Sequence, residues 1–176
     1  YGFSSVLLFL AFGTVLTLIL QSSSATMAIT LIMLSMGWIP FGMACAMVLG
    51  ENIGTTITAN IAASVGNTEA KRAAMSHTIF NVFGVFWALI LFRPFLNLVG
   101  YITETLFGLP NPAAEGFVVT DSVSPEGTAA LYGLSMLHTL FNTINTLVLV
   151  WFTKLIAKAV CIIIRAPKNQ EKEVFK

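Results

Sequence analysis

Two polar runs interrupt the apolar N-terminal part of the chain: QSSSAT at residues 21–26 and GENIGTT at residues 50–56. The first run offers a carboxamide and three consecutive hydroxyls, which are neutral oxygen ligands suited to a hard cation. The same hydroxyls, with backbone N–H groups that a helix break leaves free, can also bind an anion. Because no Lys or Arg lies near either run, an anion bound there needs a cation to balance its charge. These residues indicate coupled binding of a cation and an anion.

One carboxylate, Glu51, is the only charged side chain in residues 1–68. An ionisable residue inside a membrane segment is a candidate functional group, because it is costly to keep there. The alternative is a structural role, in which Glu51 holds a broken helix by accepting backbone N–H bonds. The sequence leaves both interpretations open.

Several other chemistries lack their motifs. Adjacent serines and two histidines could suggest a hydrolase, but the chain has no G-x-S-x-G, H-E-x-x-H or Walker motif. Cys45 and Cys161 stand in separate apolar stretches and predict neither a disulfide framework nor a metal site. No basic stripe is present to bind nucleic acid. We therefore expect no enzyme activity, no organic cofactor and no nucleic-acid partner.

The composition places the candidate residues in a membrane. Hydrophobic residues make up 56% of the 176 residues and charged residues only 10%, whereas soluble domains average about 25% charged residues. Charged side chains are almost absent from 1–68, 73–103 and 127–153. Apolar stretches of about 18 residues or more predict membrane segments. The predicted class is an all-α integral membrane protein, with residues 1–176 forming a single transmembrane repeat unit.

Residues 3–37 are predicted to form a re-entrant helical hairpin with 21–26 at its tip. The part after the tip, 26–37, makes a helix of only about 18 Å, shorter than the roughly 30 Å hydrocarbon core. Polar backbone within a membrane is tolerated only where it lines a protein-buried or water-filled cavity. The alternative is one long spanning helix with a serine face turned outward.

Residues 41–65 are predicted to form a helix broken at 50–56. Gly50 and Gly54 could instead mark a helix-packing face, but packing does not require the neighbouring carboxylate and amide. In a helix after the break, Asn52, Thr56 and Asn60 would share one face, with Thr55 beside it.

The remaining elements follow from breakers and charges. We expect a spanning helix at 73–92, an interfacial piece and extracytoplasmic loop at 95–127, a spanning helix with a cytoplasmic extension at 129–165, and a charged tail at 166–176. The loop at 101–127 carries four acidic residues and no basic one. The positive-inside rule therefore places Lys71 and the C-terminus in the cytoplasm.

A short repeat occurs on two of these helices: HTIFN at 77–81 and HTLFN at 138–142. On the second helix, helical spacing puts Ser135, His138, Asn142 and Asn145 on one face. Hydrogen bonds between helices explain this face better than direct ligand contact.

The two polar runs, in this order and spacing, resemble the type II sodium-dependent phosphate cotransporter family, whose hallmark is the QSSS motif. The resemblance covers most of 3–98, with weaker support from 138–145. It implies sodium-coupled uptake of inorganic phosphate at a plasma membrane, in bacteria the inner membrane, with Na⁺ as the co-transported ion. Family members carry two inverted repeats, and this chain holds one copy of each motif, most like the second repeat. The resemblance therefore implies half of an inverted-repeat transporter, paired with a missing first repeat or with a second copy in a homodimer.

The resemblance also assigns the candidate site. The phosphate ligands would be Ser22, Ser23, Ser24, Thr55 and Thr56. The sodium ligands would be Gln21, Ser23, Ser24, Thr26 and Asn52. Structural or coupling roles would fall to Glu51, Asn60, His138 and Asn142. Two alternatives remain: sodium-coupled symport of another oxyanion, and a non-transporting membrane scaffold or regulatory subunit.

Overall fold

The computed structural model describes residues 2–165, which fold into helices without strands. The elements are α1 (Phe3–Leu20), α2 (Ser23–Ser35), α3 (Phe41–Ala63), α4 (Thr68–Ile90), α5 (Phe92–Phe107), α6 (Pro125–Leu149), the 3₁₀ turn η1 (Val150–Phe152) and α7 (Thr153–Ile163). The prediction of an all-helical protein is confirmed. The predicted tail at 166–176 lies outside the described residues.

Side-chain caps set the starts of three helices. Ser22, Asn67 and Ser124 each accept a hydrogen bond from the backbone N–H three residues later, at the starts of α2, α4 and α6. Such caps satisfy N–H groups that have no acceptor within the helix. The polar residues between the apolar runs thus define where the helices begin.

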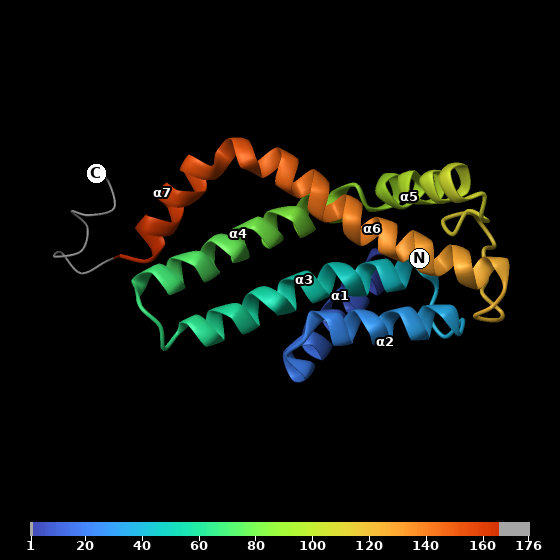
Figure 1. Cartoon of the computed structure of the whole chain (residues 1–176), viewed down its shortest axis with the longest axis horizontal. Coiled ribbons are helices and arrows are strands. Elements are labelled where there is room, and N and C mark those ends of the chain that lie inside the picture. The colour runs from blue at the N-terminus through green and yellow to red at the C-terminus, as the bar shows by residue number, and fades with distance from the viewer. Residues whose placement is uncertain (1, 166–176) are drawn as a thin grey trace.

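The first two helices form a hairpin. α1 ends at Gln21, whose backbone is left-handed (φ 51°), and α2 starts two residues later. Figure 1 shows α2 returning alongside α3, with the turn between α1 and α2 lying part-way along the molecule rather than at its end. The break predicted at 21–26 is therefore present, at Gln21 and Ser22.

The break predicted in 41–65 is wrong, because α3 runs without interruption from Phe41 to Ala63. Its glycines are contact points for α1. A Cβ on Gly50 would collide with the carbonyl oxygen of Leu10, and one on Gly54 would lie 2.8 Å from the carbonyl oxygen of Thr14. On α1, a Cβ on Gly13 would collide with the carbonyl oxygen of Met47. The small-residue spacing thus marks a close helix crossing and not a break.

Other bounds also differ from those predicted from the sequence. α5 follows α4 almost directly, since Pro94 occupies its first turn, where proline is tolerated. The predicted helix at 129–165 starts earlier, at Pro125, and bends at η1 before α7 (Figure 1).

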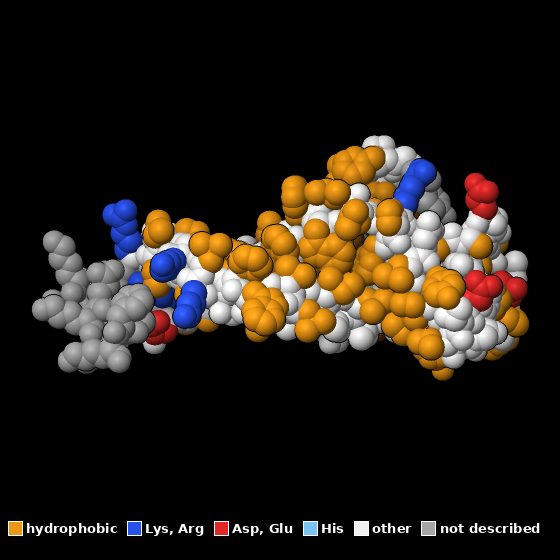
Figure 2. All heavy atoms as spheres, turned by 90° about the horizontal axis from the view of Figure 1, so that it is seen from above, with side chains coloured by type: hydrophobic (Ala, Val, Ile, Leu, Met, Phe, Trp, Pro, Cys, Tyr) orange, Lys and Arg blue, Asp and Glu red, His pale blue; other side chains and the backbone are white. Residues whose placement is uncertain are grey.

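Surface and core together describe a membrane protein. Every residue from Phe41 to Glu51 is buried, so the first half of α3 is the centre of the fold. Among residues 2–165, the helical segments Phe3–Leu20, Thr68–Ile90 and Pro125–Ile163 are long and apolar enough to cross a membrane. Figure 2 shows an apolar middle, basic side chains gathered mainly at one end and acidic ones mainly at the other.

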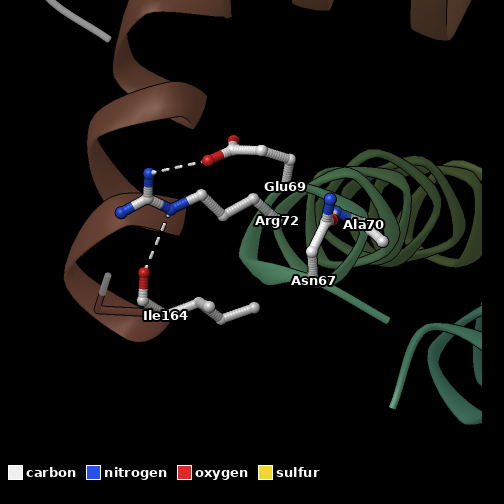
Figure 3. Close-up of polar contacts among 5 residues, drawn as sticks. All are labelled: Asn67, Glu69, Ala70, Arg72 and Ile164. Atoms are coloured by element: carbon white, nitrogen blue, oxygen red, sulfur yellow. Dashed lines mark hydrogen bonds and ion pairs between the residues drawn. The ribbon is translucent and has the colours of Figure 1, made fainter. Parts of the chain in front are cut away.

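The basic end contains one specific contact between α4 and the end of α7. The Nε of Arg72 donates to the carbonyl oxygen of Ile164 at 3.1 Å, and its Nη1 lies 3.9 Å from Glu69 (Figure 3). The arginine thereby satisfies a carbonyl that has no partner within α7. This contact ties α7 to the start of α4.

Candidate binding cleft

A cleft of about 180 Å³ lies among α2, α3, α4 and α6. Seven of its eight lining residues are polar. The lining consists of Ser23, Ser24, Met27, Glu51, Asn52, Thr55, His77 and His138. The structure thus brings six of the candidate residues from three helices to one place: Ser23, Ser24, Glu51, Asn52, Thr55 and His138.

The N-terminus of α2 opens onto this cleft. The hydroxyl of Ser22 accepts from the N–H of Ala25 at 3.2 Å, so Ser22 caps the helix and does not line the cleft. The N–H groups of Ser23 and Ser24, in the first turn, have no acceptor within the helix. With the positive end of the helix dipole, they favour a negative ligand.

Gln21 forms the turn itself. Its N–H donates to the carbonyl oxygen of Thr17 at 2.8 Å, and its side chain is exposed and outside the cleft lining. The last carbonyls of α1 also lie at this turn without helical partners. The turn therefore presents free carbonyls and free N–H groups side by side.

Glu51 is almost completely buried in the fold, with 3% of its surface exposed, yet it lines the cleft. Its Oε1 lies 2.8 Å from the hydroxyl of Thr30, on α2. Thr30 was not singled out in the sequence, although it follows Ser23 and Met27 at helical spacing on the face that meets α3. Its contact orients the carboxyl group of Glu51 between α2 and the cleft.

Thr26, a predicted sodium ligand, is fully buried and is not brought to the cleft. Its hydroxyl donates to the carbonyl oxygen of Ser22 at 3.0 Å and accepts from the hydroxyl of Thr17 at 3.2 Å. The first bond lies within the first turn of α2, and the second connects α2 with α1 directly behind the hairpin turn. The structure thus gives Thr26 contacts that shape the hairpin tip.

The polar residues of α3 fall into two groups. The amide of Asn52 donates to the carbonyl oxygen of Val48 at 2.9 Å, which leaves its own side-chain oxygen available at the cleft, beside Thr55. Thr56 is buried and donates to the carbonyl oxygen of Ile53 at 2.8 Å. Asn60 donates to the hydroxyl of Thr78, on α4, at 2.6 Å. The structure therefore does not bring Thr56 and Asn60 to the cleft.

The repeated His-Thr-x-Phe-Asn segments both reach the cleft through their histidines, His77 and His138. Asn142 does not line the cleft, and its amide donates to the carbonyl oxygen of His138 at 2.9 Å. Asn145 is fully buried and donates to the carbonyl oxygen of Phe80, on α4, at 2.8 Å. The hydrogen bond of Asn145 is thus one between two helices. His77 was missed as a lining residue, although its place in the repeat was a signal for it.

The lining suits an anion together with a hard cation. Hydroxyls, an amide oxygen and a carboxylate are ligands that Na⁺ accepts, and N–H and O–H groups bind oxyanions. Within residues 2–165, no three His, Cys, Asp or Glu side chains are grouped so as to hold a metal ion.

The amino-acid sequence of the chain is similar to those of known proteins. A family model described as Na⁺/Pi-cotransporter matches residues 3–110. The chain is 36% identical over 157 residues to "Uncharacterized protein YqeW" of Bacillus subtilis, covering 89% of this chain and 43% of that protein. It is 30% identical over 110 residues to "Putative inorganic phosphate export protein YjbB" of Escherichia coli, covering 62% and 19%.

A mammalian relative matches as well. The chain is 36% identical over 95 residues to "Sodium-dependent phosphate transport protein 2C" of Mus musculus, covering 51% of this chain and 16% of that protein. The chain thus spans less than half the length of these relatives. No solved structure matches it.

Proposed function

Because this chain belongs to the Na⁺/Pi-cotransporter family, we propose that it supplies one half of a secondary transporter that couples the movement of inorganic phosphate to Na⁺. The observation that carries the proposal is the cleft, where the N-terminus of α2 meets Glu51 and Asn52 of α3. The hairpin turn is what brings a helix end to the side of α3.

Phosphate binds at the α2 end of the cleft. The N–H and hydroxyl groups of Ser23 and Ser24 donate to its oxygens. Thr55, on α3, lines the cleft as well; its hydroxyl donates to the carbonyl oxygen of Glu51 at 2.7 Å and must turn its hydrogen away from that carbonyl to donate to phosphate. Donors of this kind bind an oxyanion without a cationic side chain, so the charge of the phosphate must be balanced by bound Na⁺.

Sodium binds beside the phosphate. Its ligands are the carboxylate of Glu51, the side-chain oxygen of Asn52 and the serine hydroxyls. Because each ion reduces the electrostatic cost of binding the other, their affinities rise together. The relation is reciprocal, and this is the physical origin of coupling. Gln21 and Thr26, which do not line this cleft, are not part of the revised ligand set.

In the membrane, α1 and α2 form a re-entrant hairpin whose tip ends inside the bilayer. The 13 residues of α2 make a helix of about 20 Å, too short for a hydrocarbon core of roughly 30 Å. The position of the turn part-way along the molecule supports this placement (Figure 1). The basic end, with Lys71 and α7, lies in the cytoplasm and the acidic loop at 101–127 outside it, in keeping with the charge distribution in Figure 2.

The other half of the site comes from a second, oppositely oriented repeat. Gln21 and Ser24, at the tip of the hairpin, are exposed, as is most of the apolar surface of α1. Exposed polar groups at mid-membrane need a protein or water-filled partner surface. The partner is either a further repeat of a longer protein or a second copy of this chain.

The direction of transport has two candidates. Uptake follows from an inward sodium gradient, as in a symporter. Export is the second candidate, because one relative carries the name of a phosphate export protein. Sulfate and arsenate should be compared with phosphate in the flux assay described next. A cleft that binds tetrahedral oxyanions through N–H and O–H groups does not by itself select phosphate.

The test is radiolabelled phosphate flux across proteoliposomes that contain the full-length natural protein, with Na⁺, K⁺ or choline outside. We expect flux only with Na⁺, and a loss of roughly ten-fold or more in phosphate affinity for Ser23→Ala. Ser4→Ala, at the outer end of α1, is the matched control and should behave as wild type. Equal flux in the three salts, with a wild-type rate for Ser23→Ala, would refute both the coupling and the site.

A further inference from the structure

The two His-Thr-x-Phe-Asn segments adopt the same local arrangement on antiparallel helices. In α4, the amide of Asn81 donates to the carbonyl oxygen of His77 at 3.0 Å, and in α6 the amide of Asn142 donates to that of His138 at 2.9 Å. Figure 1 shows α4 and α6 running in opposite directions along the molecule. Despite the opposite directions, both histidines line the same cleft.

The helix crossing just after each histidine fixes its position. Asn145 donates to the carbonyl oxygen of Phe80 and accepts from the indole N–H of Trp87 at 3.3 Å. The rings of Trp87 and Phe141 stack with their centres 5.9 Å apart. A Cβ on Gly84 would lie 2.7 Å from the ring of Phe141, so the glycine leaves room for this ring between the helices. His77 and His138 are three residues before Phe80 and Phe141 of this crossing, and because the helices are antiparallel they approach the cleft from opposite sides of it.

The histidines differ from the asparagines of these helices in one respect. The amides of Asn81, Asn142 and Asn145 all donate to backbone carbonyls. The imidazoles of His77 and His138 are exposed and, within residues 2–165, take part in no hydrogen bond. A histidine with a structural role in the core would be buried and hydrogen-bonded within the protein. These two present free ring nitrogens to the cleft.

We propose that His77 and His138 bind the anion, and that phosphate is held between the N-terminus of α2 and these two imidazoles. The inference rests on the proposed function and deepens it. An imidazole N–H donates to a phosphate oxygen, and it does so from the α4 and α6 side, which the serines of α2 cannot cover. Sodium keeps the oxygen ligands of α3, since an imidazole N–H cannot bind a cation. The imidazoles thus lie on the anion's side of the cleft and Glu51 and Asn52 on the cation's side, and the serine hydroxyls lie between the two ions.

The experiment measures two affinities separately in the full-length protein: that for phosphate at saturating Na⁺, and that for Na⁺ without phosphate. His77→Leu and His138→Leu should each weaken phosphate affinity by about ten-fold and leave Na⁺ affinity unchanged. His77→Gln and His138→Gln should recover part of the loss, because the side-chain amide retains an N–H donor. Thr139→Val, next to His138 but outside the cleft lining, is the control.

Two results would overturn the inference while leaving the proposed function intact. One is wild-type phosphate affinity in both leucine variants. The other is an equal loss of phosphate and Na⁺ affinity that glutamine does not rescue, which would mark the histidines as structural. Absence of Na⁺-dependent phosphate binding in the wild-type protein would instead refute the proposed function, and the inference with it.

Discussion

The polar runs at 21–26 and 50–56 resemble each other in sequence, and the chain uses them in opposite ways. Both combine small residues with hydroxyls and larger polar side chains, which are Gln21 in the first run and Glu51 and Asn52 in the second. At the first run the helix ends, the backbone at Gln21 turns left-handed and Ser22 caps a new helix. At the second run α3 continues, and Gly50 and Gly54 accept the backbone of α1.

The difference teaches what a helix break requires. A break needs a residue that accepts the left-handed conformation and a side chain that caps the next helix. The second run also holds residues of capping type, but the amide of Asn52 and the hydroxyl of Thr55 donate to carbonyls one turn back within α3. Its glycines are four residues apart, which places them on one face where a neighbouring helix can approach. The first run therefore supplies backbone ends to the cleft, and the second supplies only side chains.

The largest expected effect comes from Gly50→Ala. Its new Cβ collides with the carbonyl oxygen of Leu10, and a backbone atom cannot move aside without separating α1 from α3. We expect a loss of about 3 kcal/mol in the free energy of unfolding, seen as a lower melting temperature of the purified protein. Gly2→Ala, where the nearest atom would be 3.6 Å away, is the control. A stable Gly50→Ala variant would show that the second run is not a packing face.

Glu51→Gln should separate the two roles of the second run. The side chain keeps an oxygen that accepts from Thr30, so we expect little change in melting temperature. The loss of the charge should weaken Na⁺ affinity by about ten-fold, measured by calorimetric titration. Glu69→Gln, outside the cleft, provides the comparison. Unchanged Na⁺ affinity combined with a lower melting temperature would assign Glu51 a structural role alone.

Ser22→Ala tests the cap at the first run. The variant loses the acceptor for the N–H of Ala25, and we expect a cost of about 1 kcal/mol in the free energy of unfolding. Ser22→Asp should restore this stability, because aspartate also caps helices, but its charge should weaken phosphate affinity. If Ser22→Asp bound phosphate as well as wild type, the anion would not lie at the start of α2.

The smallest expected effect is on the turn residue. Gln21→Gly removes a side chain from a left-handed position, which should leave the free energy of unfolding unchanged or raise it by up to about 1 kcal/mol. Because the fold is then unaffected, any loss of phosphate flux in this variant reports the contribution of the Gln21 carboxamide to transport. Wild-type flux would mean that the carboxamide contacts neither ion.

Composition and charge were enough to predict a helical membrane protein, and the turn at Gln21 and Ser22 falls within the polar run at 21–26 that was predicted to be the hairpin tip. The break in α3 was predicted wrongly, because two glycines four residues apart serve either purpose. Whether the glycines form a break or a packing face depends on α1, where Gly13 allows the same close approach to α3 from the other side.

Candidate residues on one helix face could not be sorted from the sequence. Asn52, Thr56 and Asn60 share a periodicity, but only Asn52 lines the cleft, whereas Asn60 bonds to Thr78 on α4. Which of them meets a ligand depends on which helix lies opposite. Thr30 was overlooked for the same reason, because its partner Glu51 is on another helix. His77 was overlooked although its place in the repeat marked it, because the repeat does not show which helices surround the cleft.

The buried position of α3 has a consequence for how the protein enters its membrane. α3 carries Glu51, Asn52 and Asn60, and it is not among the helices apolar enough to cross a membrane on their own. A carboxylate or amide at the centre of a helix opposes its partition from the translocon into lipid. α1 is synthesised before α3, so the surface of α1 around Gly13 is available when α3 leaves the ribosome. We therefore expect α3 to insert together with α1, as a preformed pair during biosynthesis, rather than as a single segment.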